Sequence, residues 1–239
     1  MKIRIILLTF IALLIACKDE GRNIIAEALS TEVQKSEIAT EIMAETIVSI
    51  KDIFLLLPDD VFPLEDISLA NRKLLLKHIG EENAYAISAT PIDIYDPKNG
   101  FLSLAGMQFG WEMSYWNLRD GRKLVAVNNG TETGSDIRVF FYHNGTLNED
   151  HNYQLGAKQV YQLADFIDLE QLSPSTRKFA QQQFSKGDYS LYYQLPRQGT
   201  SLKIRLDIDQ LLDYDQAYEV PYEATKEVVL KWSNETWER

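Results

Sequence analysis

The distribution of apolar residues after position 48 predicts two short helices. Ser49 and Asp52 match a capping box with Asp in place of Glu, and the apolar run that follows stops at Pro58. Ser68 precedes a second apolar run that reaches Gly80, and a glycine at this place is typical of a left-handed helix C-cap. We therefore expect helices near residues 49–57 and 68–80.

Alternation of apolar and polar residues predicts strands in the middle of the chain, at 111–116, 123–128 and 137–141. Asp120-Gly121 and Asn144-Gly145 follow two of these runs. Both pairs are typical of two-residue hairpin turns, because such turns require a positive φ. Strands joined by hairpins are antiparallel, so we expect an antiparallel meander.

The second half of the chain repeats this order. A short helix near 165–169 and a helix from Ser173-Pro174 to Gly187 precede strands near 189–195, 202–208 and 228–232. Ser68 followed by Arg72-Lys73 also recurs as Ser173 followed by Arg177-Lys178, which indicates a duplication. The expected fold class is α+β, with two helix-helix-antiparallel-sheet repeats, 49–156 and 157–239. Together they should form a mostly antiparallel sheet with helices on one side.

The N-terminal segment has a different pattern. Lys2 and Arg4 precede an almost purely apolar run over residues 5–16, which spans about 18 Å as a helix, less than the roughly 30 Å of a bilayer core. This predicts a signal peptide over 1–16. Leu14-Ile-Ala-Cys17 resembles a lipobox, which implies cleavage before Cys17 and a lipid such as palmitate on its thiol. The alternative is an ordinary secretory leader with an incidental cysteine.

The residues after Cys17 bear on the location of the protein. Lys18-Asp19-Glu20 looks like the export signal that sends some lipoproteins to the cell surface, although a solvated charged string is an alternative interpretation. Residues 17–48 are interpreted as a lipidated tether that passes into a marginal helix. We expect a lipid anchor in the outer membrane, on its periplasmic face or at the cell surface.

Charge and cysteine content exclude several classes of function. The 239-residue chain has a net charge of −11, and removal of the leader would make it about −13, which disfavours binding to nucleic acid phosphates. Cys17 is the only cysteine. The mature body therefore has no disulfide, no thiolate metal site and no cysteine nucleophile.

Recognisable catalytic chemistry is missing from the sequence. The three histidines, His78, His143 and His151, do not have metal-ligand spacing, and no phosphate-binding or dinucleotide-binding glycine motif occurs. Asp207 and Asp209 would share one strand face, where a solvated role is expected rather than the paired-carboxylate chemistry of glycosidases. We predict no catalytic residues, no metal and no cofactor.

Large aromatic residues are the remaining candidates for a binding surface, in particular Trp111, Tyr115, Trp116 and Tyr192. Trp111 and Tyr115 share one face of the predicted strand and Trp116 lies on the other. One set must be core, whereas the other is either covered by helices or exposed for binding.

Four segments carry a resemblance to a known family: Phe54–Pro58, Lys123–Asn128, Asp136–Tyr142 and Leu230–Trp237. They resemble domain of unknown function family 3256, secreted proteins of Gram-negative bacteria. The resemblance implies a fold similar to the beta-lactamase inhibitor protein, with two helix–helix–four-strand repeats. It supplies no function and no catalytic residues.

These observations favour a non-catalytic binding or interaction module on a lipid tether, with a protein or glycan partner. The alternatives are a glycan-contacting accessory lipoprotein, which coplanar exposed rings would favour, and an unrecognised hydrolase, which a deep pocket with converging Asp, His or Ser would favour.

Overall fold

The computed structural model describes residues 48–239 apart from 63–66, 82–85, 87, 107 and 157–159. Val48–Arg239 form one compact unit. The predicted leader, the lipidation residue Cys17, the export signal Lys18–Glu20 and the tether up to residue 47 lie outside the described residues. Within the described part of the chain, no helix is long and apolar enough to cross a membrane.

The first half of this unit begins with helices and continues with strands. In chain order the elements are α3 (Ile50–Leu56), the 3-10 helix η1 (Asp59–Val61), α4 (Leu69–Lys77), β1 (Ile92–Asp96), β2 (Phe101–Leu104), β3 (Trp111–Asn117), β4 (Lys123–Thr131), β5 (Gly134–His143) and β6 (Thr146–Glu149).

The second half mixes short helices with short strands. Its elements are α6 (Leu163–Phe166), η2 (Leu169–Gln171), α7 (Pro174–Lys186), β7 (Leu191–Gln194), β8 (Leu202–Leu206), α8 (Ile208–Leu211), α9 (Tyr214–Tyr218), η3 (Tyr222–Ala224), β9 (Val228–Ser233) and β10 (Thr236–Glu238).

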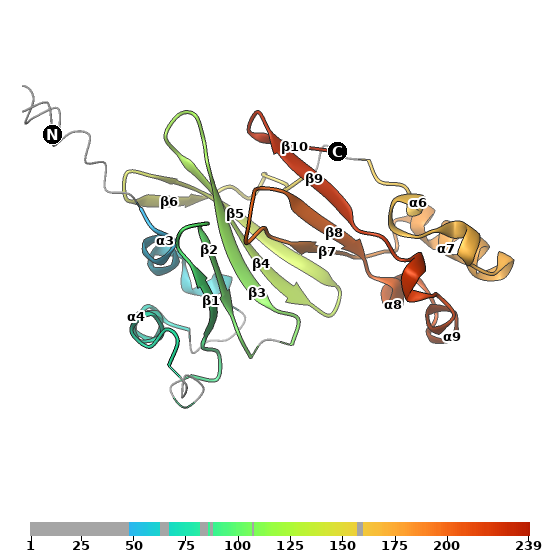
Figure 1. Ribbon diagram of the computed structural model, residues 1–239, viewed down its shortest axis with the longest axis horizontal. Coiled ribbons are helices and arrows are strands. Elements are labelled where there is room, and N and C mark those ends of the chain that lie inside the picture. The colour runs from blue at the N-terminus through green and yellow to red at the C-terminus, as the bar shows by residue number, and fades with distance from the viewer. Residues whose placement is uncertain (1–47, 63–66, 82–85, 87, 107, 157–159) are drawn as a thin grey trace, which may run out of the picture. The chain divides into compact units, whose positions relative to one another are not determined.

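Strands β1 to β6 form an antiparallel meander in sequence order (Figure 1). The hairpin signals account for this connectivity: Asn144 and Gly145, with φ of 46° and 79°, form the turn between β5 and β6. The predicted strands at 111–116, 123–128 and 137–141 are present as β3, β4 and β5.

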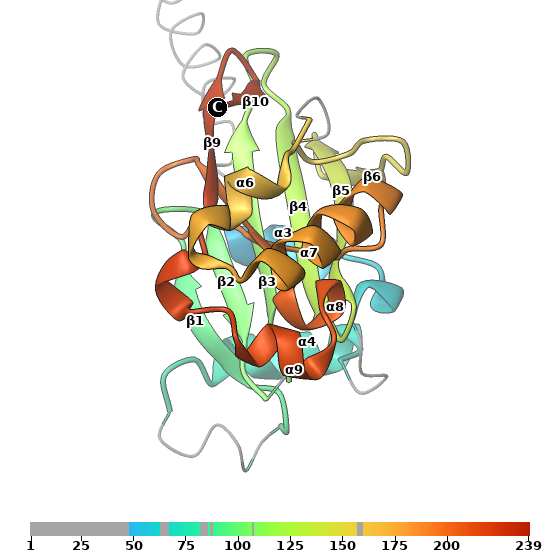
Figure 2. The same ribbon diagram turned by 90° about the vertical axis from the view of Figure 1, so that its right-hand side faces the viewer.

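The other strands form a second antiparallel sheet, in the order β10-β9-β8-β7. The expectation of one sheet is therefore wrong. The halves contribute six and four strands, α8 and α9 interrupt the second set, and the expected repeat is not confirmed. Helices also lie on both sides: α3 and α4 at one end of the unit and α6 to α9 at the other (Figures 1 and 2).

Strand β8 ends earlier than its alternating pattern predicts. Asp207 is the N-cap of α8, and its carboxylate accepts hydrogen bonds from the backbone N–H groups of Asp209 (3.1 Å) and Gln210 (3.3 Å). Aspartate favours this position because it satisfies amides that a helix start leaves unpaired. The prediction that Asp207 and Asp209 share a strand face is therefore wrong.

The six-stranded sheet separates two cores. On one face, α3 contributes Ile50, Ile53 and Phe54 to a core with Trp111. On the other face, Trp116 belongs to a core formed with the inner face of the four-stranded sheet and with α6 and α7. Both faces of β3 are consequently buried, which explains its large side chains on both sides.

Side chains of the six-stranded sheet hold the edge of β7. The Ser135 hydroxyl accepts from Tyr193 N–H (2.9 Å), the Asn128 amide donates to the Tyr193 carbonyl (2.7 Å), and Glu112 accepts from Leu195 N–H (2.7 Å). Asn128 also donates to Glu112 (3.0 Å). We call these contacts the polar seam. They satisfy backbone groups that an edge strand would otherwise expose.

Candidate functional site

The two predicted tryptophans are core residues. Trp111 is 1% exposed and its indole N–H donates to the Val61 carbonyl (3.2 Å), whereas Trp116 is 3% exposed and donates to Thr200 (3.1 Å). Because each face of the six-stranded sheet is covered, neither ring can contribute to an exposed binding surface.

Tyr115 and Tyr192 are partly buried, and they make unrelated contacts. The Lys123 ammonium lies 4.7 Å from the Tyr115 ring centre, and burial raises the pKa of Tyr115. Tyr192, on β7, donates its hydroxyl proton to the Thr131 carbonyl (2.9 Å). The four predicted aromatic residues therefore do not converge on one surface.

The histidines are dispersed. His78 lies 2.9 Å from a Glu81 carboxylate oxygen, His151 lies 3.3 Å from Glu149, and His143 contacts its neighbour Asn144. The described residues contain no group of three side chains that could hold a metal ion.

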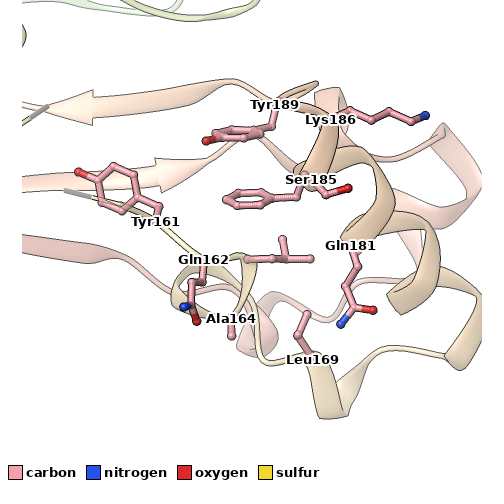
Figure 3. Close-up of a pocket in the computed structure, with 11 residues that line it drawn as sticks. Tyr161, Gln162, Ala164, Leu169, Gln181, Ser185, Lys186 and Tyr189 are labelled. Atoms are coloured by element: carbon pink, nitrogen blue, oxygen red, sulfur yellow. The ribbon is translucent and has the colours of Figure 1, made fainter. Parts of the chain in front are cut away.

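A groove of about 720 Å³ lies between α6, α7 and the start of β7 (Figure 3). Aromatic and aliphatic side chains form most of it, with polar groups at its sides. Its lining residues are Tyr161, Gln162, Leu163, Ala164, Leu169, Gln181, Phe184, Ser185, Lys186, Gly187 and Tyr189. We call it the aromatic groove.

The end of α7 builds one wall of the aromatic groove. Gly187 has φ +82°, and the N–H groups of Gly187 and Asp188 donate to the carbonyls of Phe184 (3.1 Å) and Gln183 (3.3 Å). This Schellman arrangement reverses the chain and returns Tyr189 onto Phe184. The two rings stack with centres 4.2 Å apart and an interplanar angle of 7°.

The start of α6 borders the groove, and the C-terminal residue supports it from outside the lining. Gln162 N–H donates to the Asp165 carboxylate (2.6 Å), which also pairs with Arg239 (2.5 Å). The Arg239 guanidinium lies 5.7 Å from the centre of the Tyr161 ring. Figure 3 shows the Tyr161 ring at one end of the groove.

The Tyr161 hydroxyl is buried and, among the described residues, has no hydrogen-bond partner. Burial raises the pKa of Tyr161 far above its ordinary range, so the phenol stays protonated at neutral pH. Leaving a buried hydroxyl unpaired is unfavourable.

The described lining of the groove is mostly uncharged. Among the lining residues that the structure describes, Lys186 is the only charged one, and its ammonium donates to the Gln183 side chain (3.0 Å). Ser185 donates to the Gln182 carbonyl (2.8 Å) instead of to a general base. The described lining thus offers rings, amides and hydroxyls.

Sequence analysis identified Gly187 as a helix stop and Tyr189 as the start of a strand, but it did not combine them into a site. A usable signal was present: rings at positions 184 and 189 flank a C-cap glycine, so a Schellman turn brings them together. The contribution of Tyr161 and Arg239 had no comparable local signal.

No protein-family model matches the chain, and no curated protein matches it. Among solved structures it is similar to a domain of an uncharacterized protein from Porphyromonas gingivalis W83. The TM-score is 0.48 and the sequence identity 14%, over 80% of this chain and 96% of the other. A likeness of this size assigns neither a family nor a function.

Proposed function

We propose that this chain is a membrane-anchored, non-catalytic binding module whose aromatic groove takes an extended, uncharged segment of a partner protein. The observation that carries the proposal is the partly exposed ring pair Phe184 and Tyr189 beside the exposed amides of Gln162 and Gln181. The size of the groove lies within the 300–1,000 Å³ typical of ligand sites.

The geometry of the rings favours a peptide over a glycan. Phe184 and Tyr189 are stacked face to face, so they present a single ring platform, not a row of coplanar platforms along a sugar chain. Extended proline-bearing segments dock in aromatic-lined grooves. The glutamine amides resemble peptide groups in offering both a donor and an acceptor.

The charge of the groove defines the kind of segment. The whole chain carries −11, yet among the described residues no carboxylate lines the groove, and the lining Lys186 is hydrogen-bonded to Gln183. A charged segment would gain little from such a lining and would lose hydration. An uncharged segment with apolar side chains matches the rings and the aliphatic floor.

The N-terminal segment supports the membrane-anchored part of the proposal. The lipobox-like sequence at Cys17 supports a lipid anchor, and Lys18-Asp19-Glu20 supports export to the outer membrane. Helix α3, which follows the tether in sequence, lies at the end of the unit away from the groove (Figure 1). Mass spectrometry of native protein tests the anchor: lipid on Cys17 supports it, and a free thiol contradicts it.

A binding experiment tests the groove. The mature lipoprotein in detergent is titrated with a library of uncharged, proline-containing peptides, and with a neutral glucan oligosaccharide as competitor. We expect saturable peptide binding that Tyr189→Ala weakens about tenfold, the effect of losing one good ring contact. Tyr95→Ala, a change in another partly buried tyrosine, is the matched control. Glucan binding without peptide binding would favour the glycan alternative.

A further inference from the structure

A second surface stands out by its exposure. Tyr214, Tyr218 and Tyr222 are 84%, 86% and 87% exposed. Tyrosine usually buries much of its ring, so three side chains this exposed within nine residues are unusual. Helix α9 and η3 carry them, at the end of the unit that also holds α6 and α7 (Figure 2).

Helix α9 is fixed against the rest of the unit. Tyr214 and Tyr218 are four residues apart and therefore share one helix face. On the opposite side, Ala217 and Val220 pack against the core, and the Thr176 hydroxyl donates to the Glu219 carboxylate (3.2 Å). The rings are thus displayed on an anchored element, which lowers the entropy lost on binding.

The segment that carries these rings is acidic. Residues 213–223 contain Asp213, Asp215, Glu219 and Glu223 and no lysine or arginine. We call this segment, with its three tyrosines, the acidic tyrosine face. Such a surface repels phosphate groups and anionic lipids, and it attracts cations through both the carboxylates and the ring faces.

A hollow of about 590 Å³ is lined in part by Tyr222, and its charge is also negative. Its charged lining consists of Asp207, Asp209, Glu223 and Glu227 against Arg205 and Lys226. Both cations are engaged, Arg205 with Glu227 at 3.8 Å and the Lys226 ammonium with the Ala164 carbonyl at 3.4 Å. The hollow is therefore net negative and has room for a basic side chain.

We propose that the acidic tyrosine face docks an arginine-rich segment of a partner protein, with guanidinium groups on the tyrosine rings and one side chain in the adjoining hollow. Arginine fits better than lysine because its planar, weakly hydrated guanidinium stacks on rings. This site is separate from the aromatic groove, which is neutral and takes an uncharged segment.

The test uses the mature lipoprotein in detergent and a fluorescent peptide in which arginine alternates with serine. Lysine–serine and glutamine–serine peptides of equal length serve as comparison probes. Binding of the arginine peptide should be saturable and stronger than that of the lysine peptide. The triple variant Y214A/Y218A/Y222A keeps the net charge, and it should bind the arginine peptide about tenfold more weakly, since each exposed cation–π contact contributes a factor of a few.

Controls separate this site from general attraction to an acidic protein. The variant F109A removes an exposed ring outside the face and should bind as the parent does. The variant D215N/E223Q keeps the rings and should weaken binding with a shallower dependence on salt. Circular dichroism confirms that each variant is folded.

Equal affinity in the triple variant and the parent, or equal affinity for the arginine and lysine peptides, overturns the proposal. Tyr189→Ala should leave this binding unchanged, so failure here is distinguishable from failure of the groove.

Discussion

Two clusters of aromatic rings, one in each half of the unit, differ in how exposed their rings are. In the first, Phe54 and Phe62 contact Trp111 with ring centres 6.0 Å and 5.0 Å away, and all three are buried. In the second, Phe184 stacks on Tyr189, and Phe166 links this pair to Tyr161; Phe166 is buried, whereas Tyr161, Phe184 and Tyr189 remain partly exposed. Both clusters arise where helices lie over a sheet.

The difference lies in how completely the helices cover the rings. Helix α3 and η1 close over the first cluster, and the Val61 carbonyl accepts the Trp111 indole proton. In the second cluster α6 has only four residues and α7 ends at Gly187, so the space between them stays open. Covered rings stabilise the fold, whereas open rings keep part of their hydrophobic free energy for a ligand.

The largest effect is expected in the closed cluster. Trp111→Ala should lower the free energy of unfolding by about 3–5 kcal/mol, because it leaves a cavity and an unpaired Val61 carbonyl. Urea denaturation of the variant and the parent measures the difference. Phe109→Ala, at a ring that is 40% exposed, is the control. Equal losses in the two variants would show that the closed cluster is no more tightly packed than the surface.

The polar seam should have the next largest effect, since it holds β7 beside the open cluster. Glu112→Ala removes the acceptor of Leu195 N–H and of the Asn128 amide and should lower the free energy of unfolding by about 1–3 kcal/mol. Glu112→Gln keeps one acceptor oxygen and should lose less. Equal losses in the two variants would mean that the charge of Glu112, rather than its hydrogen bonds, stabilises the seam.

Glu112 also predicts a dependence of stability on pH. Burial raises the pKa of Glu112, and the hydrogen bonds from Leu195 N–H and Asn128 only partly offset this. A raised pKa means that the folded state holds the proton more tightly than the unfolded state. The stability contributed by this group should therefore be complete below about pH 4 and be lost as pH rises through the raised pKa. Other carboxylates titrate in both proteins, so the measurement is the difference in the free energy of unfolding between the parent and Glu112→Gln, which should fall as pH rises across this range.

Substitution in the open cluster should separate stability from binding. Tyr189→Ala should lower the free energy of unfolding by about 1 kcal/mol, because a partly exposed ring contributes less than a buried one. The same variant should bind the peptide about tenfold more weakly, although most of its stability is kept. A stability loss as large as that of Trp111→Ala would mean that Tyr189 is a core residue, and would contradict the distinction between the clusters.

The smallest effect on stability is expected at the acidic tyrosine face. Tyr218→Ala should change the free energy of unfolding by no more than about 0.5 kcal/mol, since the ring is 86% exposed. Thermal unfolding of this variant beside Ala217→Ser, a change on the packed side of the same helix, provides the comparison. A larger loss for Tyr218→Ala would show that this ring has a structural role.

Local signals in the sequence determined most elements. Ser49 caps α3, Ser173 caps α7, Gly187 ends it in a left-handed conformation, and Asn144-Gly145 forms a hairpin turn. These features depend on residues within a few positions of one another, so the sequence alone was sufficient. The C-cap predicted at Gly80 was only partly right. Gly80 is left-handed, with φ +77°, but α4 already ends at Lys77 with His78 as its C-cap.

The tertiary structure alone decided what covers each face. An alternating pattern states that a strand face is buried but not what buries it, and β3 carries tryptophans on both faces. The division into two sheets depends on contacts between residues 58 to 83 positions apart, such as Ser135 with Tyr193 and Glu112 with Leu195. No local pattern encodes such contacts. The closure of one ring cluster and the opening of the other follow from this packing.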